Sequence, residues 1–64
     1  MDNFNNVVKL LLETDGCYFV KRGLGDYDIW FSPVINSHFP IGDLIKSRRH
    51  ANLILRLSGV NKEV

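Results

Sequence analysis

Two runs of aromatic and β-branched residues, on either side of a short glycine-containing segment, dominate the middle of the sequence. Residues 17–22 and 26–31 flank Gly23-Leu24-Gly25, a pattern typical of two antiparallel strands joined by a hairpin turn. Residues 36–41 follow as a short third strand. Pro40 lies near the end of this run and cannot donate a hydrogen bond to a neighbouring strand, so we expect an edge strand.

The second run has two faces of different character, because successive side chains of a strand point to opposite sides. One face carries Tyr27, Ile29 and Phe31, and the other carries Asp26, Asp28 and Trp30. We expect the first face to be buried, which leaves Trp30 pointing away from the core.

Helical spacing marks both ends of the chain. Phe4, Val7, Val8 and Leu11 lie at i, i+3, i+4 and i+7, which predicts a helix over residues 3–14. Asp2 or Asn3 can cap the start of this helix, and Asp15-Gly16 ends it.

A second helix is predicted after Ser47, which is a good N-cap residue. Gly59 closes this helix, Val60 folds back onto it, and residues 61–64 read as a frayed tail. The inner stripe of the helix consists of Ala51, Ile54, Leu55 and Ser58.

Together these patterns predict one α+β domain over residues 1–64, with the element order α-β-β-β-α and both helices on one face of a three-stranded antiparallel sheet. A chain of 64 residues with 45% hydrophobic residues is globular, but its core supplies only a few kcal/mol of net stability. We therefore expect a homo- or hetero-oligomer.

The cysteine count and the hydrophobic pattern indicate the cellular compartment of the protein. The one cysteine, Cys17, excludes an internal disulfide and suits a reducing cytoplasm, where an inert buried thiol is the default. Apolar runs such as residues 10–12 are far short of a membrane span, and no signal-peptide pattern is present. We expect a cytoplasmic protein without a membrane contact.

Positive charge is concentrated at the start of the second helix, although the net charge is only +1. Arg48 and Arg49 follow Lys46 where free backbone N–H groups and the helix dipole favour anions, an arrangement that suits RNA backbone. Gly23 and Gly25 could let backbone approach a phosphate closely. The simpler interpretations are a solvated basic face for the arginines and an ordinary hairpin turn for the glycines.

Few side chains are suited to catalysis. His38 and His50 are the only residues that ordinarily titrate near neutral pH, and each reads more simply as a surface histidine. No carboxylate or cysteine lies at ligand spacing from them, so we expect neither a metal site nor a cofactor. We also find no nucleophile–base pair.

Apolar side chains outside the predicted core mark a candidate partner surface. Leu53 and Leu57 lie four residues apart on the second helix, and Trp30 points away from the presumed core. These residues form a protein contact, or the leucines only widen the buried stripe.

The order of elements and several local strings resemble the HicA family, the toxins of HicA–HicB toxin–antitoxin pairs. The resemblance covers nearly the whole chain. The matching strings are residues 7–11, 16–20, 23–26, 29–33 and 45–48, then Ala51-Asn52, Ile54-Leu55 and Gly59-Val60. It implies a double-stranded-RNA-binding-domain-like fold, a metal-independent endoribonuclease that cleaves messenger RNA (an mRNA interferase), and a HicB-like antitoxin partner.

The resemblance also assigns a catalytic position. The family has a histidine at the start of the second strand, after the glycine and the serine or aspartate, and this chain has Tyr27 there. Imidazole, with an ordinary pKa of about 6.5, suits removal of a proton from a ribose 2′-OH, whereas a phenol ordinarily ionises near pH 10. Tyr27 is then an inactivating substitution, a natural loss of activity, or part of a variant mechanism that uses Tyr27 or another histidine. If the chain does not cleave, it is a non-catalytic module that binds RNA or an antitoxin.

Overall fold

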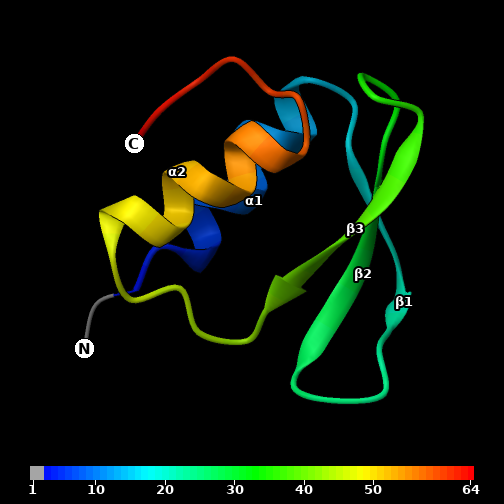
Figure 1. Ribbon diagram of the computed structural model, residues 1–64, viewed down its shortest axis with the longest axis horizontal. Coiled ribbons are helices and arrows are strands. Elements are labelled where there is room, and N and C mark those ends of the chain that lie inside the picture. The colour runs from blue at the N-terminus through cyan, green and yellow to red at the C-terminus, as the bar shows by residue number, and fades with distance from the viewer. Residues whose placement is uncertain (1–2) are drawn as a thin grey trace.

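The computed structural model describes residues 3–64 and has the predicted element order α-β-β-β-α (Figure 1). The sheet is antiparallel, with strand order β1-β2-β3, so β3 is an edge strand as expected. The elements are α1 (Asn5–Thr14), β1 (Tyr18–Arg22), β2 (Tyr27–Ser32), β3 (Ser37–Gly42) and α2 (Arg48–Leu57). The predicted fold class is confirmed.

Both helices lie on one face of the sheet and contact each other, while the opposite face is left uncovered (Figure 1). The helices bury Val8 and Leu12 from α1, together with the predicted inner stripe of α2. The sheet contributes Trp30 from β2 and two side chains of β3 to the same core. The two β3 side chains are Phe39 and Ile41, and the other members of this core are Cys17, Ile45 and Val60.

The expected orientation of β2 is wrong. Trp30 is only 3% exposed and faces the helices, whereas Tyr27, Ile29 and Phe31 lie on the uncovered face and are half-buried. The register explains this orientation, because Trp30 pairs with Phe39 and directly opposite residues share a face of the sheet. The apolar residues of β2 alone favoured the wrong face, because the core-side face also carries Asp28. Asp28 is tolerated there because it lies at the end of the sheet, where it pairs with Lys9 and Arg22.

The ends of both helices follow the predicted chemistry. Gly16 and Gly59 have φ values of +91° and +81°, the left-handed conformation that glycine adopts most readily after a helix. The N-cap residue of α1 is Phe4, which makes no side-chain cap bond, but the Asn3 side-chain oxygen accepts a hydrogen bond from the Asn5 backbone N–H at 2.9 Å. Asp2, the other expected cap, lies outside the described residues.

The C-terminal segment packs against the domain, so the expectation of a frayed tail is wrong. Lys62 Nζ lies 2.7 Å from Asp15 Oδ1, and the Val64 backbone N–H donates to Asn52 Oδ1 at 2.7 Å. Val60 is buried as predicted. These contacts attach the end of the chain to α2 and to the turn that follows α1.

Candidate functional site

The turn between β1 and β2 is a tight hairpin loop that supports the ring of Tyr27. The Gly23 backbone N–H donates to the Tyr27 carbonyl at 2.9 Å and closes the loop. A Cβ atom on Gly23 would lie 2.2 Å from Tyr27 Cε2, so the ring rests directly on this glycine. A Cβ atom on Gly25 would lie 3.4 Å from Tyr27 Cε1, an ordinary contact. Packing of the Tyr27 ring therefore explains the glycine at position 23 without a bound phosphate.

An ion cluster that the sequence did not indicate fixes the neighbouring end of the sheet. Arg22 binds Asp43 through two hydrogen bonds, with Nη2 2.8 Å from Oδ2, and its Nη1 lies 3.0 Å from Asp28 Oδ1. The hydrogen bond from Arg22 holds the pKa of the Asp43 carboxyl below its usual range, and Asp43 and Asp28 in turn raise the pKa of Arg22. The Asp43 backbone N–H also donates to the Asp26 carbonyl at 3.0 Å. The cluster thus ties the segment after β3 to the β1–β2 turn.

The start of α2 is capped as predicted and remains exposed. The Ser47 hydroxyl accepts a hydrogen bond from the His50 backbone N–H at 3.1 Å, and Lys46, Arg48 and Arg49 are all exposed. Within residues 3–64 none of these three cations forms an ion pair. Their charge is therefore available to a ligand.

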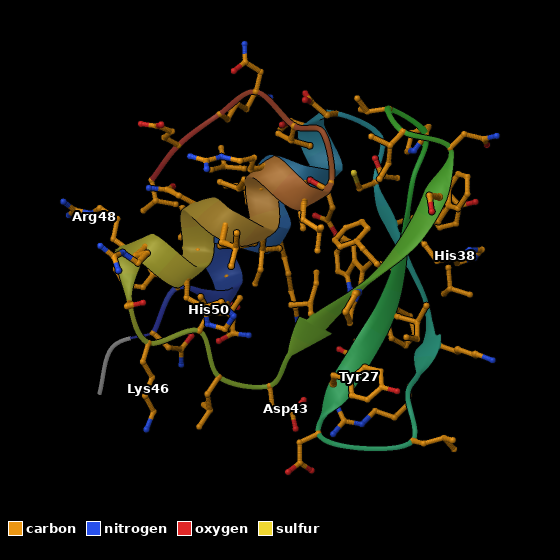
Figure 2. All side chains as sticks on the ribbon, in the orientation of Figure 1. Tyr27, His38, Asp43, Lys46, Arg48 and His50 are labelled. Carbon is orange, nitrogen blue, oxygen red and sulfur yellow. The ribbon has the colours of Figure 1, made fainter. Side chains whose placement is uncertain are left out.

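Most of the sequence-predicted RNA-site residues are spread along one edge of the molecule, with Tyr27 at its sheet end and Lys46 and Arg48 at its helix end (Figure 2). Figure 2 shows Tyr27, Asp43 and Lys46 in succession along this edge, with Arg48 beyond them at the start of α2. Gly23 and Gly25 belong to the turn at one end of it. We call this strip, from the β1–β2 turn to the start of α2, the turn–helix edge. Its charge is mixed, because Asp26 is exposed at the turn.

The uncovered face of the sheet carries an aromatic cluster that sequence reasoning missed. Phe31 in the central strand pairs with Tyr18 on one side and with His38 on the other. The ring centroids of Tyr18 and Phe31 are 5.6 Å apart, and those of Phe31 and His38 are 5.1 Å apart. The residue types were visible in the sequence, but their alignment depends on the register of three strands.

A shallow hollow of about 530 Å³ connects this cluster to the candidate catalytic position. Tyr27 and His38 both line it, together with Ile29, Phe39 and Pro40. His38 is opposite Phe31, four residues along β2 from Tyr27, which corresponds to about 13 Å at about 3.3 Å per residue. The two side chains therefore share a surface but do not form a nucleophile–base pair.

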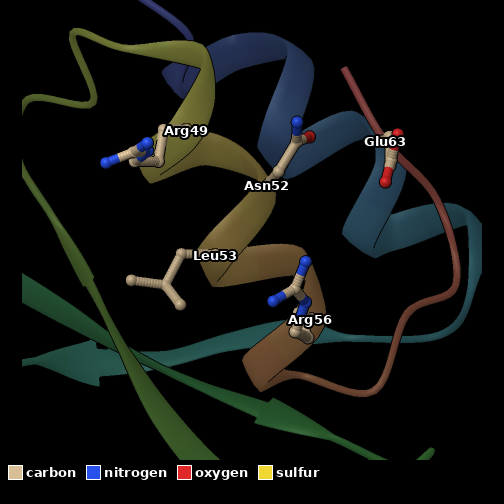
Figure 3. A pocket seen from close by; sticks show the side chains of 5 residues that line it. All are labelled: Arg49, Asn52, Leu53, Arg56 and Glu63. Carbon is tan, nitrogen blue, oxygen red and sulfur yellow. The ribbon is translucent and has the colours of Figure 1, made fainter.

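The solvent-facing side of α2 forms a second hollow, of about 430 Å³ (Figure 3). Arg49, Asn52, Leu53 and Arg56 line it at i, i+3, i+4 and i+7, with Glu63 from the C-terminal segment opposite. Leu53 and Leu57 are each more than half exposed, so they do not widen the buried stripe. Trp30 is in the core, so the expectation that it contacts a partner loses its basis.

Cys17 is buried, as expected. Among residues 3–64, no group of three or more histidine, cysteine or acidic side chains is arranged to hold a metal ion. No helix in this part of the chain is long and apolar enough to span a membrane.

Comparisons with models of known protein families, with curated proteins and with solved structures found no match to this chain.

Proposed function

We propose that this chain is a HicA-like toxin component that binds messenger RNA along the turn–helix edge, and that Tyr27 leaves it with little or no cleavage activity. The observation that carries the proposal is the position of Tyr27. This residue starts β2 next to the glycine turn, at the histidine position of the family that the chain resembles, and lies on the uncovered face of the sheet. Lys46 and Arg48, which form no ion pair within residues 3–64, lie further along the turn–helix edge (Figure 2).

Cleavage of RNA without a metal requires a base that removes the proton from a ribose 2′-OH, so that its oxygen can attack the adjacent phosphorus. A phenol, which ordinarily ionises near pH 10, is a weak acceptor of this proton at pH 7. Arg22 is held by Asp43 and Asp28, so its charge is already compensated. The weak basicity of the phenol and the compensated charge of Arg22 both support inefficient cleavage.

Binding of the RNA backbone is assigned to Lys46, Arg48 and Arg49, because phosphate contacts by cations supply most nonspecific affinity. Arginine adds paired donors that match a phosphate. The Arg48→Ala/Arg49→Ala double variant should bind single-stranded RNA more weakly, and the slope of log affinity against log salt should fall by about 1.4. Unchanged binding would remove these residues from the site.

The test of the site is cleavage of a purified single-stranded messenger RNA, with chelator present, by the parent chain and by Tyr27→His. Tyr27→Phe serves as the matched control, because it keeps the ring on Gly23 and removes the hydroxyl. We expect only Tyr27→His to cleave. Cleavage by the parent and by all variants would assign the base to another residue, and cleavage by the parent but not by Tyr27→Phe would make the tyrosine itself functional.

A second candidate function is a non-catalytic module that binds a HicB-like antitoxin or RNA. The two exposed leucines on α2 favour the protein partner, since arginines flank Leu53 in the hollow of Figure 3. The mass of the chain, alone and mixed with a HicB-like protein, should reveal a homo- or hetero-oligomer. The Leu53→Asp/Leu57→Asp variant should lose the complex, and an unchanged complex would exclude these leucines from the interface.

A toxin that acts on messenger RNA works in the cytoplasm. A free thiol at Cys17, buried in the core, is compatible with that reducing compartment.

A further inference from the structure

The uncovered sheet face displays aromatic rings on all three strands at one level. Tyr18 is 54% exposed, His38 is exposed, and Phe31 lies half-buried between them. The rings meet at interplanar angles of 39° and 70° rather than stacking flat on one another. Tilted and edge-on contacts leave ring surface open to a further planar group.

The charge on this face suits a negatively charged ligand. Lys21 pairs with Ile29 and so lies on the uncovered face, because a bulge between Phe19 and Lys21 shifts the register of β1. The paired residues of this face include no carboxylate, whereas Asp28 lies on the opposite face with Arg22. A planar group attached to an anionic backbone fits this combination better than an acidic or aliphatic protein segment.

We propose that the uncovered sheet face binds unpaired bases of single-stranded RNA by stacking on Tyr18 and His38, with Phe31 as the platform between them. The inference rests on the proposed function, because it takes RNA as the ligand, and it narrows that ligand to single strands. Bases within a duplex are already stacked and cannot reach the rings. The hollow beside the cluster leads to Tyr27, so a strand whose bases stack on the cluster can continue along the hollow toward the candidate catalytic position.

The chain offers a matched pair of substitutions for the test. Tyr18→Leu removes an exposed ring from the proposed face. Phe19→Leu removes a ring of nearly equal exposure, 53%, from the opposite side of the same strand, since Phe19 pairs with Trp30. Circular dichroism and Trp30 fluorescence would verify that both variants fold.

Binding of a fluorescent single-stranded RNA and of the corresponding duplex is measured by anisotropy. We expect the parent to prefer the single strand, and Tyr18→Leu to weaken that binding at least about fivefold. Phe19→Leu should change it by less than about twofold. A 2-aminopurine base in the single strand should change its fluorescence on binding to the parent and much less on binding to Tyr18→Leu.

The other possible outcomes overturn the inference, and each identifies which part of it fails. If Tyr18→Leu and Phe19→Leu bind equally well, or if the duplex binds more tightly, RNA binding stands and stacking on the sheet fails. If the parent binds no RNA, the proposed function fails with it. If Tyr18→Leu instead loses only the complex with a HicB-like protein, the sheet face is a protein interface.

Discussion

Gly23 is the residue at which packing and the candidate site meet most directly. The Tyr27 ring occupies the space of a Cβ atom there, with Cε2 only 2.2 Å away. Gly23→Ala must push this ring aside, so we expect a loss of unfolding free energy of roughly 1–3 kcal/mol. Urea denaturation measures the loss. Gly25→Ala is the control, because its new methyl group would lie 3.4 Å from the ring and should cost much less.

Introducing Gly23→Ala into the Tyr27→His variant tests whether displacement of the Tyr27 ring causes the loss of stability. Imidazole is smaller than a phenol ring, so Gly23→Ala should destabilise the histidine variant less than the parent. The difference between the two costs is the coupling energy of a double-mutant cycle. Equal costs in both backgrounds would attribute the effect of Gly23→Ala to the backbone of the turn.

At the scale of single elements, the cap of α2 is the feature whose energy is simplest to predict. The Ser47 hydroxyl accepts from the His50 backbone N–H, and no acidic residue in the first turn supplements it. Ser47→Ala should therefore lower the unfolding free energy by about 1 kcal/mol, measured in urea. Ser37→Ala is the control, because Ser37 is exposed and its hydroxyl has only a 3.5 Å contact with the neighbouring carbonyl. If Ser47→Ala and Ser37→Ala lowered the unfolding free energy equally, the cap would contribute no more to stability than an exposed serine hydroxyl.

The elements themselves could be predicted because their signals are local. Glycines at the helix ends, a serine cap and period-two alternation each act over a few residues, and every predicted helix and strand is present within two residues of its expected bounds. Which face of β2 is buried is not local. It depends on pairing with β3, where Phe39 and Ile41 alternate with His38 and Pro40 and fix the side of Trp30.

At the scale of the whole molecule, the sheet has two faces with different roles. Two helices cover one face and make the core, and the other face exposes the aromatic cluster and the hollow that contains Tyr27. Sequence reasoning located Tyr27 and the cations of α2. It could not place them along one edge, because this arrangement arises from the path of residues 43–47 between the sheet and α2 (Figure 2).

The ion cluster at this edge makes a pH-dependent contribution to the stability of the whole domain. The hydrogen bond from Arg22 lowers the folded-state pKa of Asp43, so the unfolded chain binds its proton first as the pH falls. The stabilisation is therefore complete above the ordinary aspartate pKa of about 3.9 and is lost as the pH falls through the lowered folded value. It is modest, because the Arg22 and Asp43 side chains are 50% and 42% exposed and water screens the pair.

Asp43→Asn removes this contribution and should lower the melting temperature at neutral pH. The difference from the parent should be largest above about pH 5 and should shrink from about pH 4 downward. Thermal unfolding followed by circular dichroism between pH 7 and pH 2 measures it. Asp26→Asn is the matched control, because Asp26 lies on the same edge but forms no ion pair within residues 3–64. A difference for Asp43→Asn that stays constant with pH would show that its carboxylate acts through packing, because a contribution from its charge must fade as the folded state takes up the proton.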